Sequence, residues 1–194
     1  MREVLVLLLL GACGRIGFDL DDDAGPGPDA DLAKVCGAAY QPVPGLRSRY
    51  RVASRNVSWF TAELDCESDG GHLAIPDDAI ENGWINDQTT GWIGVSDHAR
   101  EGSFVTVTGG PPTITMFDAM EPSDSNNDED CIEVRANRLW NDTGCKVSRE
   151  FVCECDGVKM PSTPVWCDTT TATNCGECGT PCPGSLACNA QICT

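Results

Sequence analysis

Thirteen cysteines in a chain of 194 residues constrain this protein more than any other feature of its sequence. Thiols stay reduced in the cytosol, so this number indicates an oxidising exterior in which cysteines pair as disulfides. The length fits one mid-sized domain with appendages and is too short for a barrel enzyme of about 250 residues. The formal net charge of −17 argues against nucleic acid as a partner, because phosphate binding needs clustered Lys and Arg.

The N-terminus is typical of an export signal. Arg2 precedes an apolar run from Val4 to Leu10, which is far shorter than the ~20 residues that span a bilayer. The segment from Leu10 to Cys13 resembles the bacterial lipobox, which implies cleavage of a signal peptide at residues 1–12, diacylation of Cys13 and tethering to a membrane. The alternative is an ordinary signal peptide with an incidental cysteine. Without Cys13, 12 cysteines remain, an even number that can pair completely. We therefore expect an exported protein, lipid-anchored at the bacterial cell surface or outer membrane.

Residues 13–35 predict an acylated, acidic linker without ordered structure. The segment has few apolar residues, contains Gly-Pro repeats and carries like charges that repel one another, so it cannot offset the entropy lost on ordering. Its aspartates are Asp19, Asp21, Asp22, Asp23, Asp29 and Asp31. Calcium binding by these aspartates is an alternative, but a solvated tether is the favoured interpretation.

Two helices are expected after Cys36, where the apolar pattern becomes globular. Ser58 is a candidate N-cap for a helix that runs through Cys66, because apolar positions recur there at helical spacing. Gly70 and Gly71 end that helix. A second helix is predicted after Pro76, capped by Asp77 or Asp78.

Short strands are predicted at four places: residues 91–95, 103–107, 131–134 and 151–153. Between the second and third of these strands, residues 109–130 show almost no periodicity and are rich in Asp, Asn, Ser, Pro and Gly. A long irregular loop inside a compact domain is usually functional or disordered. Two helices followed by short strands around a long polar loop indicate an α+β domain.

The loop and the strand that follows supply many oxygen ligands within 22 residues: Glu121, Asp124, Asp128, Glu129, Asp130, Asn141 and Asp142. Arg135 and Arg138 are the bases nearest to them in the sequence. Packed carboxylates repel, so either the loop stays solvated or a cation organises it. Calcium accepts carboxylate, amide and hydroxyl oxygens, whereas transition metals prefer the nitrogen and sulfur ligands that this loop lacks.

Residues 36–156 resemble a C-type lectin-like domain. The matching elements follow the order of the family: Cys66, Gly70-Gly71-His72-Leu73-Ala74, Trp92-Ile93-Gly94, Glu101-Gly102 with Phe104, Glu121-Pro122-Ser123, Glu129-Asp130-Cys131, Trp140-Asn141-Asp142, Cys145 and Phe151-Val152-Cys153-Glu154. The resemblance implies the C-type lectin fold, with two helices, two small antiparallel sheets and a long calcium-binding loop. It also implies the disulfides Cys66–Cys153 and Cys131–Cys145. Cys36 and Cys155 then remain and could pair with each other.

The resemblance further implies two calcium (Ca²⁺) sites. The principal calcium would be held by Glu121, Ser123, Glu129, Asn141 and Asp142, with a cis bond between Glu121 and Pro122. Two vicinal sugar hydroxyls would complete its shell and hydrogen-bond to Glu121, Ser123, Glu129 and Asn141. The auxiliary calcium would be held by Asp97, Glu101, Asp124 and Asp130.

The Glu121-Pro122-Ser123 motif predicts which sugars the site prefers. Sugar-binding relatives of mannose preference carry Glu-Pro-Asn, and galactose-preferring relatives carry Gln-Pro-Asp. Glu121 follows the mannose pattern, whereas Ser123 is shorter and lacks the amide. The loop has no tryptophan to stack on galactose, since Phe117 is the only aromatic residue between Val107 and Cys131. We therefore expect mannose-, fucose- or glucose-type glycans as partners, and no nucleic acid.

Other functions stay open beside sugar binding. The loop calcium could order an adhesion module for a protein or a surface. An enzyme is disfavoured, because neither His72 nor His98 has a Ser or Cys partner in a recognisable nucleophile motif, although a glycosidase carboxylate pair is not strictly excluded. Trp140 could stack on sugar when taken alone, but a core position is favoured, as for Trp59, Trp84 and Trp92.

The C-terminus predicts a linker at residues 157–166 and a small disulfide-rich module at residues 167–194. Its six cysteines are Cys167, Cys175, Cys178, Cys182, Cys188 and Cys193. A zinc site at Cys175 and Cys178 is an alternative, but an exported context favours three disulfides. Six cysteines allow 15 pairings, among which the sequence does not choose. The module resembles short cysteine-rich repeats at the ends of bacterial surface proteins.

Overall fold

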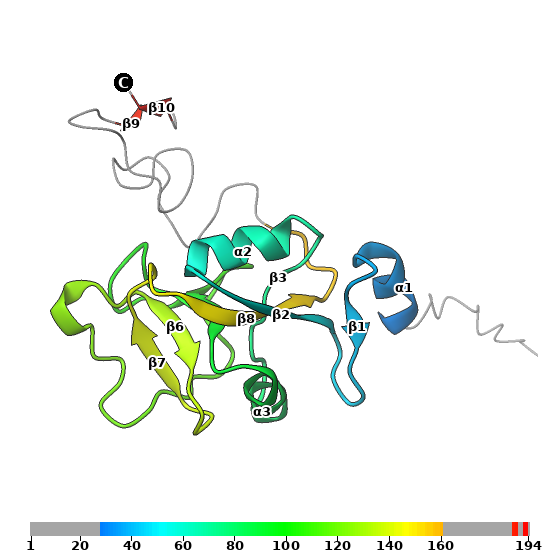
Figure 1. Cartoon of the computed structure of the whole chain (residues 1–194), viewed down its shortest axis with the longest axis horizontal. Coiled ribbons are helices and arrows are strands. Elements are labelled where there is room, and N and C mark those ends of the chain that lie inside the picture. Colours follow the sequence, from blue (N-terminus) through cyan, green and yellow to red (C-terminus); the bar gives the residue numbers. More distant parts are fainter. Residues whose placement is uncertain (1–27, 161–187, 190–191, 194) are drawn as a thin grey trace, which may run out of the picture.

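The computed structural model describes residues 28–160, 188–189 and 192–193 (Figure 1). The helices are α1 (Pro28–Val35), α2 (Trp59–Glu67), α3 (Ala79–Gln88) and the 3₁₀ helix η1 (Ser125–Asn127). The strands are β1 (Gln41–Pro42), β2 (Arg49–Val57), β3 (His72–Leu73), β4 (Trp92–Ser96), β5 (Val105–Thr106), β6 (Cys131–Val134), β7 (Trp140–Thr143), β8 (Arg149–Cys155), β9 (Cys188–Asn189) and β10 (Ile192–Cys193). Within these ranges no helix has the length and apolar character needed to cross a membrane.

Both expected helices form, and their first turns are capped by the side chains predicted for them. The Ser58 hydroxyl accepts a hydrogen bond from the Thr61 N–H at 3.3 Å, at the start of α2. Asp78, rather than Asp77, caps α3, because its carboxylate accepts the N–H groups of Ile80 and Glu81 at 2.8 and 2.9 Å. These bonds satisfy amides that have no partner inside the helix.

Helix α1 corrects the expectation of an unstructured linker up to residue 35. Its Leu32 side chain is only 8% exposed and packs in the core cluster that includes Cys36. The Leu32 carbonyl accepts the Cys36 N–H at 2.8 Å, so the helix leads directly into the domain. Apolar burial beside a disulfide stabilises order that the charged composition alone does not predict.

Several further expectations fall mainly outside the described residues. The signal peptide at residues 1–12, Cys13 and most of the tail lie there. Met160, in the expected linker, packs against the core of the domain, so the folded part extends past residue 156. Within the expected C-terminal module, β9 and β10 pair as an antiparallel ladder.

The domain sheet consists of two antiparallel groups joined by one parallel pairing. Strand β8 pairs with β2 and β3, and β2 pairs with β1. Strand β4 pairs with β5 and β6, and β6 pairs with β7. The join is the parallel pairing of β4 with β8, where Trp92 lies opposite Phe151. Helices α2 and α3 lie on opposite sides of the β2–β8 pair, and the β6–β7 hairpin lies at the end away from α1 (Figure 1).

Three tryptophans form the centre of the core. Trp59, Trp92 and Trp140 have no exposed surface. Each indole N–H still has a partner, namely the Ile93 carbonyl at 2.8 Å, the Val57 carbonyl at 2.8 Å and the Asn82 side-chain oxygen at 2.7 Å. Trp140 therefore has the core position favoured from the sequence, because a buried indole is stable only when its N–H is bonded.

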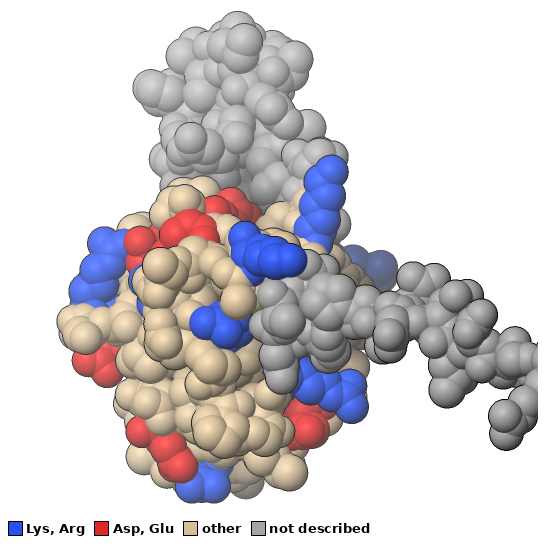
Figure 2. All heavy atoms as spheres, turned by 90° about the vertical axis from the view of Figure 1, so that its right-hand side faces the viewer, with Lys and Arg blue, Asp and Glu red and all other residues tan. Residues whose placement is uncertain are grey.

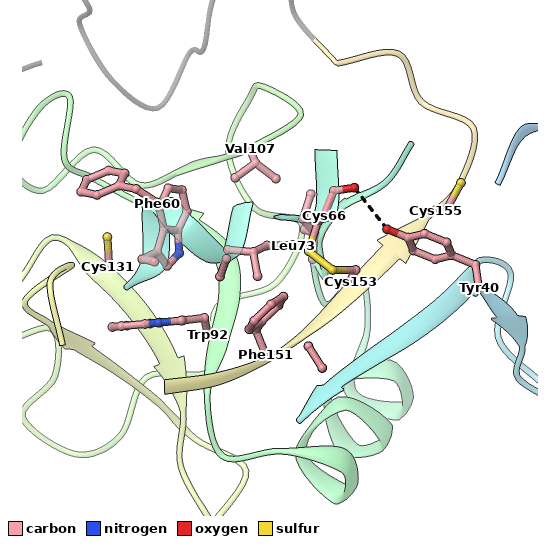
Figure 3. Packing of buried hydrophobic residues seen from close by; sticks show 14 of the residues in the cluster. Tyr40, Phe60, Cys66, Leu73, Trp92, Val107, Cys131, Phe151, Cys153 and Cys155 are labelled. Carbon is pink, nitrogen blue, oxygen red and sulfur yellow. Dashed lines mark hydrogen bonds between the residues drawn. A yellow bond between two sulfur atoms is a disulfide. The ribbon is translucent and has the colours of Figure 1, made fainter. Parts of the chain in front are cut away.

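The six cysteines of the domain form three disulfides: Cys36–Cys155, Cys66–Cys153 and Cys131–Cys145. Cys66 and Cys153 join α2 to β8 in the buried layer that also contains Leu73 and Phe151 (Figure 3). Cys131 and Cys145 close the β6–β7 hairpin beside the loop. On the face drawn in Figure 2, basic and acidic side chains are interspersed, so the described surface there has no continuous patch of one charge.

We predict that removing the Cys66–Cys153 disulfide destabilises the domain more than removing the Cys131–Cys145 disulfide does. Cys66 and Cys153 are 87 residues apart and Cys131 and Cys145 are 14 apart, and a longer closed loop restricts the unfolded chain more. Replacing the first pair by alanine should cost about 4.5 kcal/mol of unfolding free energy, and replacing the second about 3 kcal/mol. Denaturant unfolding of the double variants measures both values. A larger loss for the short loop would contradict this account.

Candidate functional site

The loop between β5 and β6 has an unusual backbone. Met120, Asp124, Asn126 and Asn127 have positive φ angles of 72°, 42°, 65° and 52°. Asn and Asp tolerate this left-handed region, whereas Met pays a steric cost in it. Such conformations persist only where surrounding contacts hold them, and they cluster at ligand-binding sites. The loop is thus ordered by specific contacts, although it has almost no regular structure.

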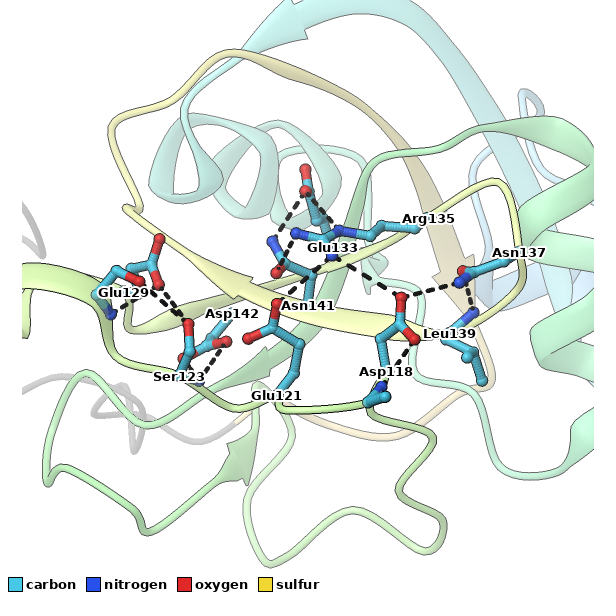
Figure 4. A network of polar contacts seen from close by, with 12 residues as sticks. Asp118, Glu121, Ser123, Glu129, Glu133, Arg135, Asn137, Leu139, Asn141 and Asp142 are labelled. Atoms are coloured by element: carbon cyan, nitrogen blue, oxygen red, sulfur yellow. Dashed lines mark hydrogen bonds and ion pairs between the residues drawn. The ribbon is translucent and has the colours of Figure 1, made fainter.

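Two carboxylates hold the tip of this loop. Asp142, buried on β7, accepts the Ser123 N–H at 3.0 and 2.8 Å and the Asp124 N–H at 2.7 Å. Glu129 accepts the Ser125 N–H at 2.8 Å and the Ser123 hydroxyl at 3.1 Å (Figure 4). Ser123, Glu129 and Asp142 are therefore in one hydrogen-bonded group, as the expected principal ligand set requires.

Glu121 and Asn141 complete the expected principal set. The peptide bond between Glu121 and Pro122 is cis, as the family resemblance implies. The Glu121 side chain is 13% exposed, and its Oε2 is buried without a hydrogen-bond partner among the described residues. Its Oε1 accepts from Arg135 at 3.4 Å, and the same guanidinium donates to Asn141 Oδ1. Arg135 thus bridges two residues expected to bind the cation.

A charged network behind Asn141 was not predicted from the sequence. Asn141 Nδ2 donates to Glu133 Oε1 at 3.1 Å, and Glu133 Oε2 accepts from Arg149. Glu133 lies opposite Asn141 in the β6–β7 ladder and is buried. The available signal was a single acidic residue inside the apolar strand Cys131–Val134. Its partners depend on strand register, which the sequence pattern does not specify there.

A second acidic cluster corresponds to the expected auxiliary site. Ligand oxygens of Asp97, Glu101 and Asp130 all lie within 4.8 Å of one another. Asp97 is 1% exposed, and its Oδ1 is buried with no hydrogen-bond partner in the described part of the chain. Burial, with the neighbouring charges of Glu101 and Asp130, raises the pKa of Asp97 to about 7. Asp124, the fourth expected ligand, is not within this group.

Two carboxylates of this cluster also make hydrogen bonds within the domain. Asp97 Oδ2 accepts the Gly102 N–H at 2.8 Å, and Asp130 is hydrogen-bonded to His98 at 3.0 Å. His98, Asp130 and Cys145 also lie close enough to share a metal, but Cys145 is bonded to Cys131 and offers no thiolate. The cluster of Asp97, Glu101 and Asp130 therefore presents carboxylate oxygens beside the His98 ring and offers no thiolate.

Both clusters fit calcium. Each contains a buried carboxylate oxygen without a hydrogen-bond partner in the described domain, Glu121 Oε2 in one and Asp97 Oδ1 in the other. Buried carboxylates are stable only when protonated, hydrogen-bonded or paired with a cation. The ligand atoms are carboxylate, amide and hydroxyl oxygens, which is the set that calcium prefers. The arrangement can hold hard cations next to an exposed surface.

Comparison with known proteins gives the same family as the sequence motifs. Residues 55–155 match the family model described as "Lectin C-type domain". Collectin-11 of Danio rerio is 36% identical over 114 residues, which cover 55% of this chain and 42% of that protein. The chain therefore spans less than half the length of this curated relative.

Two solved structures are similar in fold. The carbohydrate-recognition domain of the mouse scavenger receptor C-type lectin matches with a TM-score of 0.56 at 23% identity, over 66% of this chain and all of that one. A calcium-independent type II antifreeze protein matches with a TM-score of 0.56 at 26% identity, over 62% of this chain and 93% of that one.

We predict that Asp97→Asn raises the melting temperature of the protein in chelator at pH 8. The change removes a buried negative charge next to Glu101 and Asp130. Because the folded-state pKa of Asp97 lies above its ordinary value of 3.8, the wild-type carboxyl gains a proton as pH falls through 7, and the wild type then recovers stability.

The melting-temperature advantage of Asp97→Asn should therefore shrink between pH 8 and pH 5. Thermal melts at unit pH steps in chelator measure it, with Asp87→Asn as the control on an exposed carboxylate. A difference in melting temperature between Asp97→Asn and the wild type that does not change with pH would contradict the raised pKa of Asp97.

Proposed function

Because the chain belongs to the C-type lectin domain family, whose members are non-enzymatic carbohydrate-binding proteins, we propose that it binds carbohydrate through calcium held in the loop between β5 and β6. The observation that carries this proposal is the buried Glu121 Oε2, which has no hydrogen-bond partner in the described part of the chain and lies in a group of ligand oxygens that matches the family motif. A buried carboxylate oxygen without a donor is costly, and a bound cation removes that cost.

The principal calcium would be held by Glu121, Ser123, Glu129, Asn141 and Asp142. The ion supplies a Lewis-acidic contact for two vicinal hydroxyls of the sugar. Glu121 and Glu129 accept hydrogen bonds from those hydroxyls, and the Asn141 amide donates one. The Ser123 hydroxyl now donates to Glu129, and it can turn to the ligand because a hydroxyl rotates freely.

The same residues support a preference for mannose-, fucose- or glucose-type glycans. Glu121 offers a carboxylate acceptor where galactose-preferring relatives have an amide. Phe117 does not offer a stacking platform, because its ring packs 5.8 Å from Trp140 and 5.0 Å from Phe104 between ring centroids. Because Phe117 is engaged in these ring contacts, we expect galactose to lack its usual apolar contact at this site.

The auxiliary calcium would be held by Asp97, Glu101 and Asp130, with Asp124 joining when the loop closes on the ion. Asp97 precedes β5, and Asp130 directly precedes β6. A cation between them would neutralise three clustered carboxylates and fasten the end of the loop to the segment that follows β4. This site supports the order of the principal site and does not contact sugar.

We also propose an exported protein, lipid-anchored through Cys13 at a bacterial cell surface or outer membrane, with a C-terminal cysteine-rich module. Three disulfides in the domain support an oxidising compartment. The lipobox-like segment from Leu10 to Cys13 supports the anchor. The binding domain would then face outward on an acidic tether, where glycans on cells or polymers are accessible.

A calcium-ordered adhesion module without sugar binding is the second candidate. Arg135 donates into Asn141 and Glu121, the side chains that a sugar hydroxyl would use. Ser123 also has a single hydroxyl where the mannose pattern has an amide. A glycan array distinguishes the two candidates, because clear calcium binding with no glycan retained would favour adhesion.

We predict that residues 28–160 are retained on immobilised mannan in calcium and released by chelator. Asn141→Ala should abolish retention, because it removes an expected ligand of both ion and sugar. Asp87→Asn, an exposed carboxylate change on α3, is the matched control and should bind as the wild type does. Equal retention with and without chelator would contradict a calcium-bridged mechanism.

We predict that Glu121→Gln combined with Ser123→Asp weakens binding to mannose and shifts the preference toward galactose. The double change reverses the order of acceptor and donor around the ion. Competition of mannan retention by free mannose and free galactose measures the ratio. An unchanged ratio in a variant that still binds calcium would count against this site.

A further inference from the structure

We propose that Arg135 is an internal cation that competes with calcium for Glu121 and Asn141 and so sets the calcium affinity of the principal site. This inference rests on the proposed calcium site. Arg135 lies just beyond the end of β6, and its side chain is 42% exposed. Figure 4 shows its guanidinium among the side chains of Asn141, Glu121, Glu133 and Asp118.

Arg135 contacts two of the expected ligand residues, at Asn141 Oδ1 and at the Glu121 oxygen that is not the unpartnered one. One Nη donates to Asn141 Oδ1, and the other lies 3.4 Å from Glu121 Oε1. A guanidinium is always charged and presents several N–H donors in one plane. Glu121 and Asn141 therefore share one positive charge, that of Arg135.

Glu133 determines which end of the Asn141 amide faces Arg135. An ionised carboxylate only accepts hydrogen bonds, so the Asn141 NH₂ group must point to Glu133 Oε1, 3.1 Å away. Arg149 pairs with the other oxygen of Glu133. Asn141 Oδ1, the only atom of this amide that can bind calcium, is left facing the guanidinium.

A guanidinium and a divalent ion on the same two side chains repel each other. Calcium binding at Asn141 Oδ1 therefore requires Arg135 to withdraw from that atom. The exposed side chain has an alternative partner in Asp118, whose Oδ2 lies 3.9 Å from Arg135 Nη1. Asp118 is itself held by Asn137 at 2.9 Å and is not an expected calcium ligand.

Arg135 thus has opposite effects in the two states of the site. Without calcium it stabilises the loop by pairing with Glu121. With calcium it lowers affinity, because its withdrawal from Asn141 Oδ1 and the charge repulsion beside Glu121 are part of the binding reaction. The site would respond to higher calcium concentrations than the same ligand set without Arg135.

The test is Arg135→Met, which removes the charge and keeps the length of the side chain. Arg138→Met is the matched control, because Arg138 lies in the same β6–β7 turn and pairs with Asp87 instead. Calcium affinity is measured by titration calorimetry, and again with Asp97→Asn present to suppress the auxiliary site. Melting temperature in chelator is measured for each variant.

We expect Arg135→Met to bind calcium at least fivefold more tightly than the wild type and to melt at a lower temperature in chelator. Arg138→Met should change the affinity less than twofold. An unchanged or weaker affinity in Arg135→Met, while the wild type binds calcium, would overturn the role of Arg135 alone. Absence of calcium binding in both proteins would overturn the proposed function as well.

A second measurement does not depend on the folding of the variant. In the wild type, the Nε–H signal of Arg135 in nuclear magnetic resonance spectra should shift and exchange faster with solvent as calcium is added. The Nε–H signal of Arg149 should change less, because that side chain stays paired with Glu133. An Arg135 signal that is unchanged at saturating calcium would overturn the proposal.

Discussion

Repulsion between carboxylates is the constraint on which the rest of this structure depends. The fold brings five carboxylates to one end of the sheet: Asp97, Glu121, Glu129, Asp130 and Asp142. Hydrogen-bond donors or cations must compensate their negative charges there. The carboxylates of Asp142 and Glu129 accept hydrogen bonds from backbone N–H groups of the loop. One oxygen each of Glu121 and Asp97 has no hydrogen-bond partner among the described residues. We propose that these two oxygens mark the cation sites.

A rigid scaffold makes it possible to hold such a loop. Strands β6 and β7 are joined by the Cys131–Cys145 disulfide, and Trp140 anchors β7 in the core through its bond to Asn82. The Cys66–Cys153 disulfide fastens α2 to β8 on the other side of the sheet. The loop can therefore adopt left-handed residues and expose polar side chains, because its ends are fixed by buried, covalently linked strands.

The sequence predicted much of the fold but missed its longest strand. The helices α2 and α3 follow from caps and periodicity, and β6 and part of β8 follow from their apolar runs. Strand β2 was missed because its sequence, RYRVASRNV, is polar and does not alternate cleanly. Its pairing with β8 over long sequence distances decides its conformation. Helix α1 was missed because the stabilising contact, Leu32 in the core, lies in an acidic segment.

The sequence by itself determined the chemical types of the candidate ligands and their order along the chain, because motif residues and turn residues act over a few positions. Only the tertiary structure decided which groups contact each candidate ligand oxygen. Glu133 faces Asn141 because of the register of β6 with β7, and Arg135 reaches Glu121 because the loop folds back over β7. Asp124 does not join the group of Asp97, Glu101 and Asp130, because the path of the loop sets where its carboxylate lies. Such contacts join segments distant in sequence, and no local pattern encodes their distances.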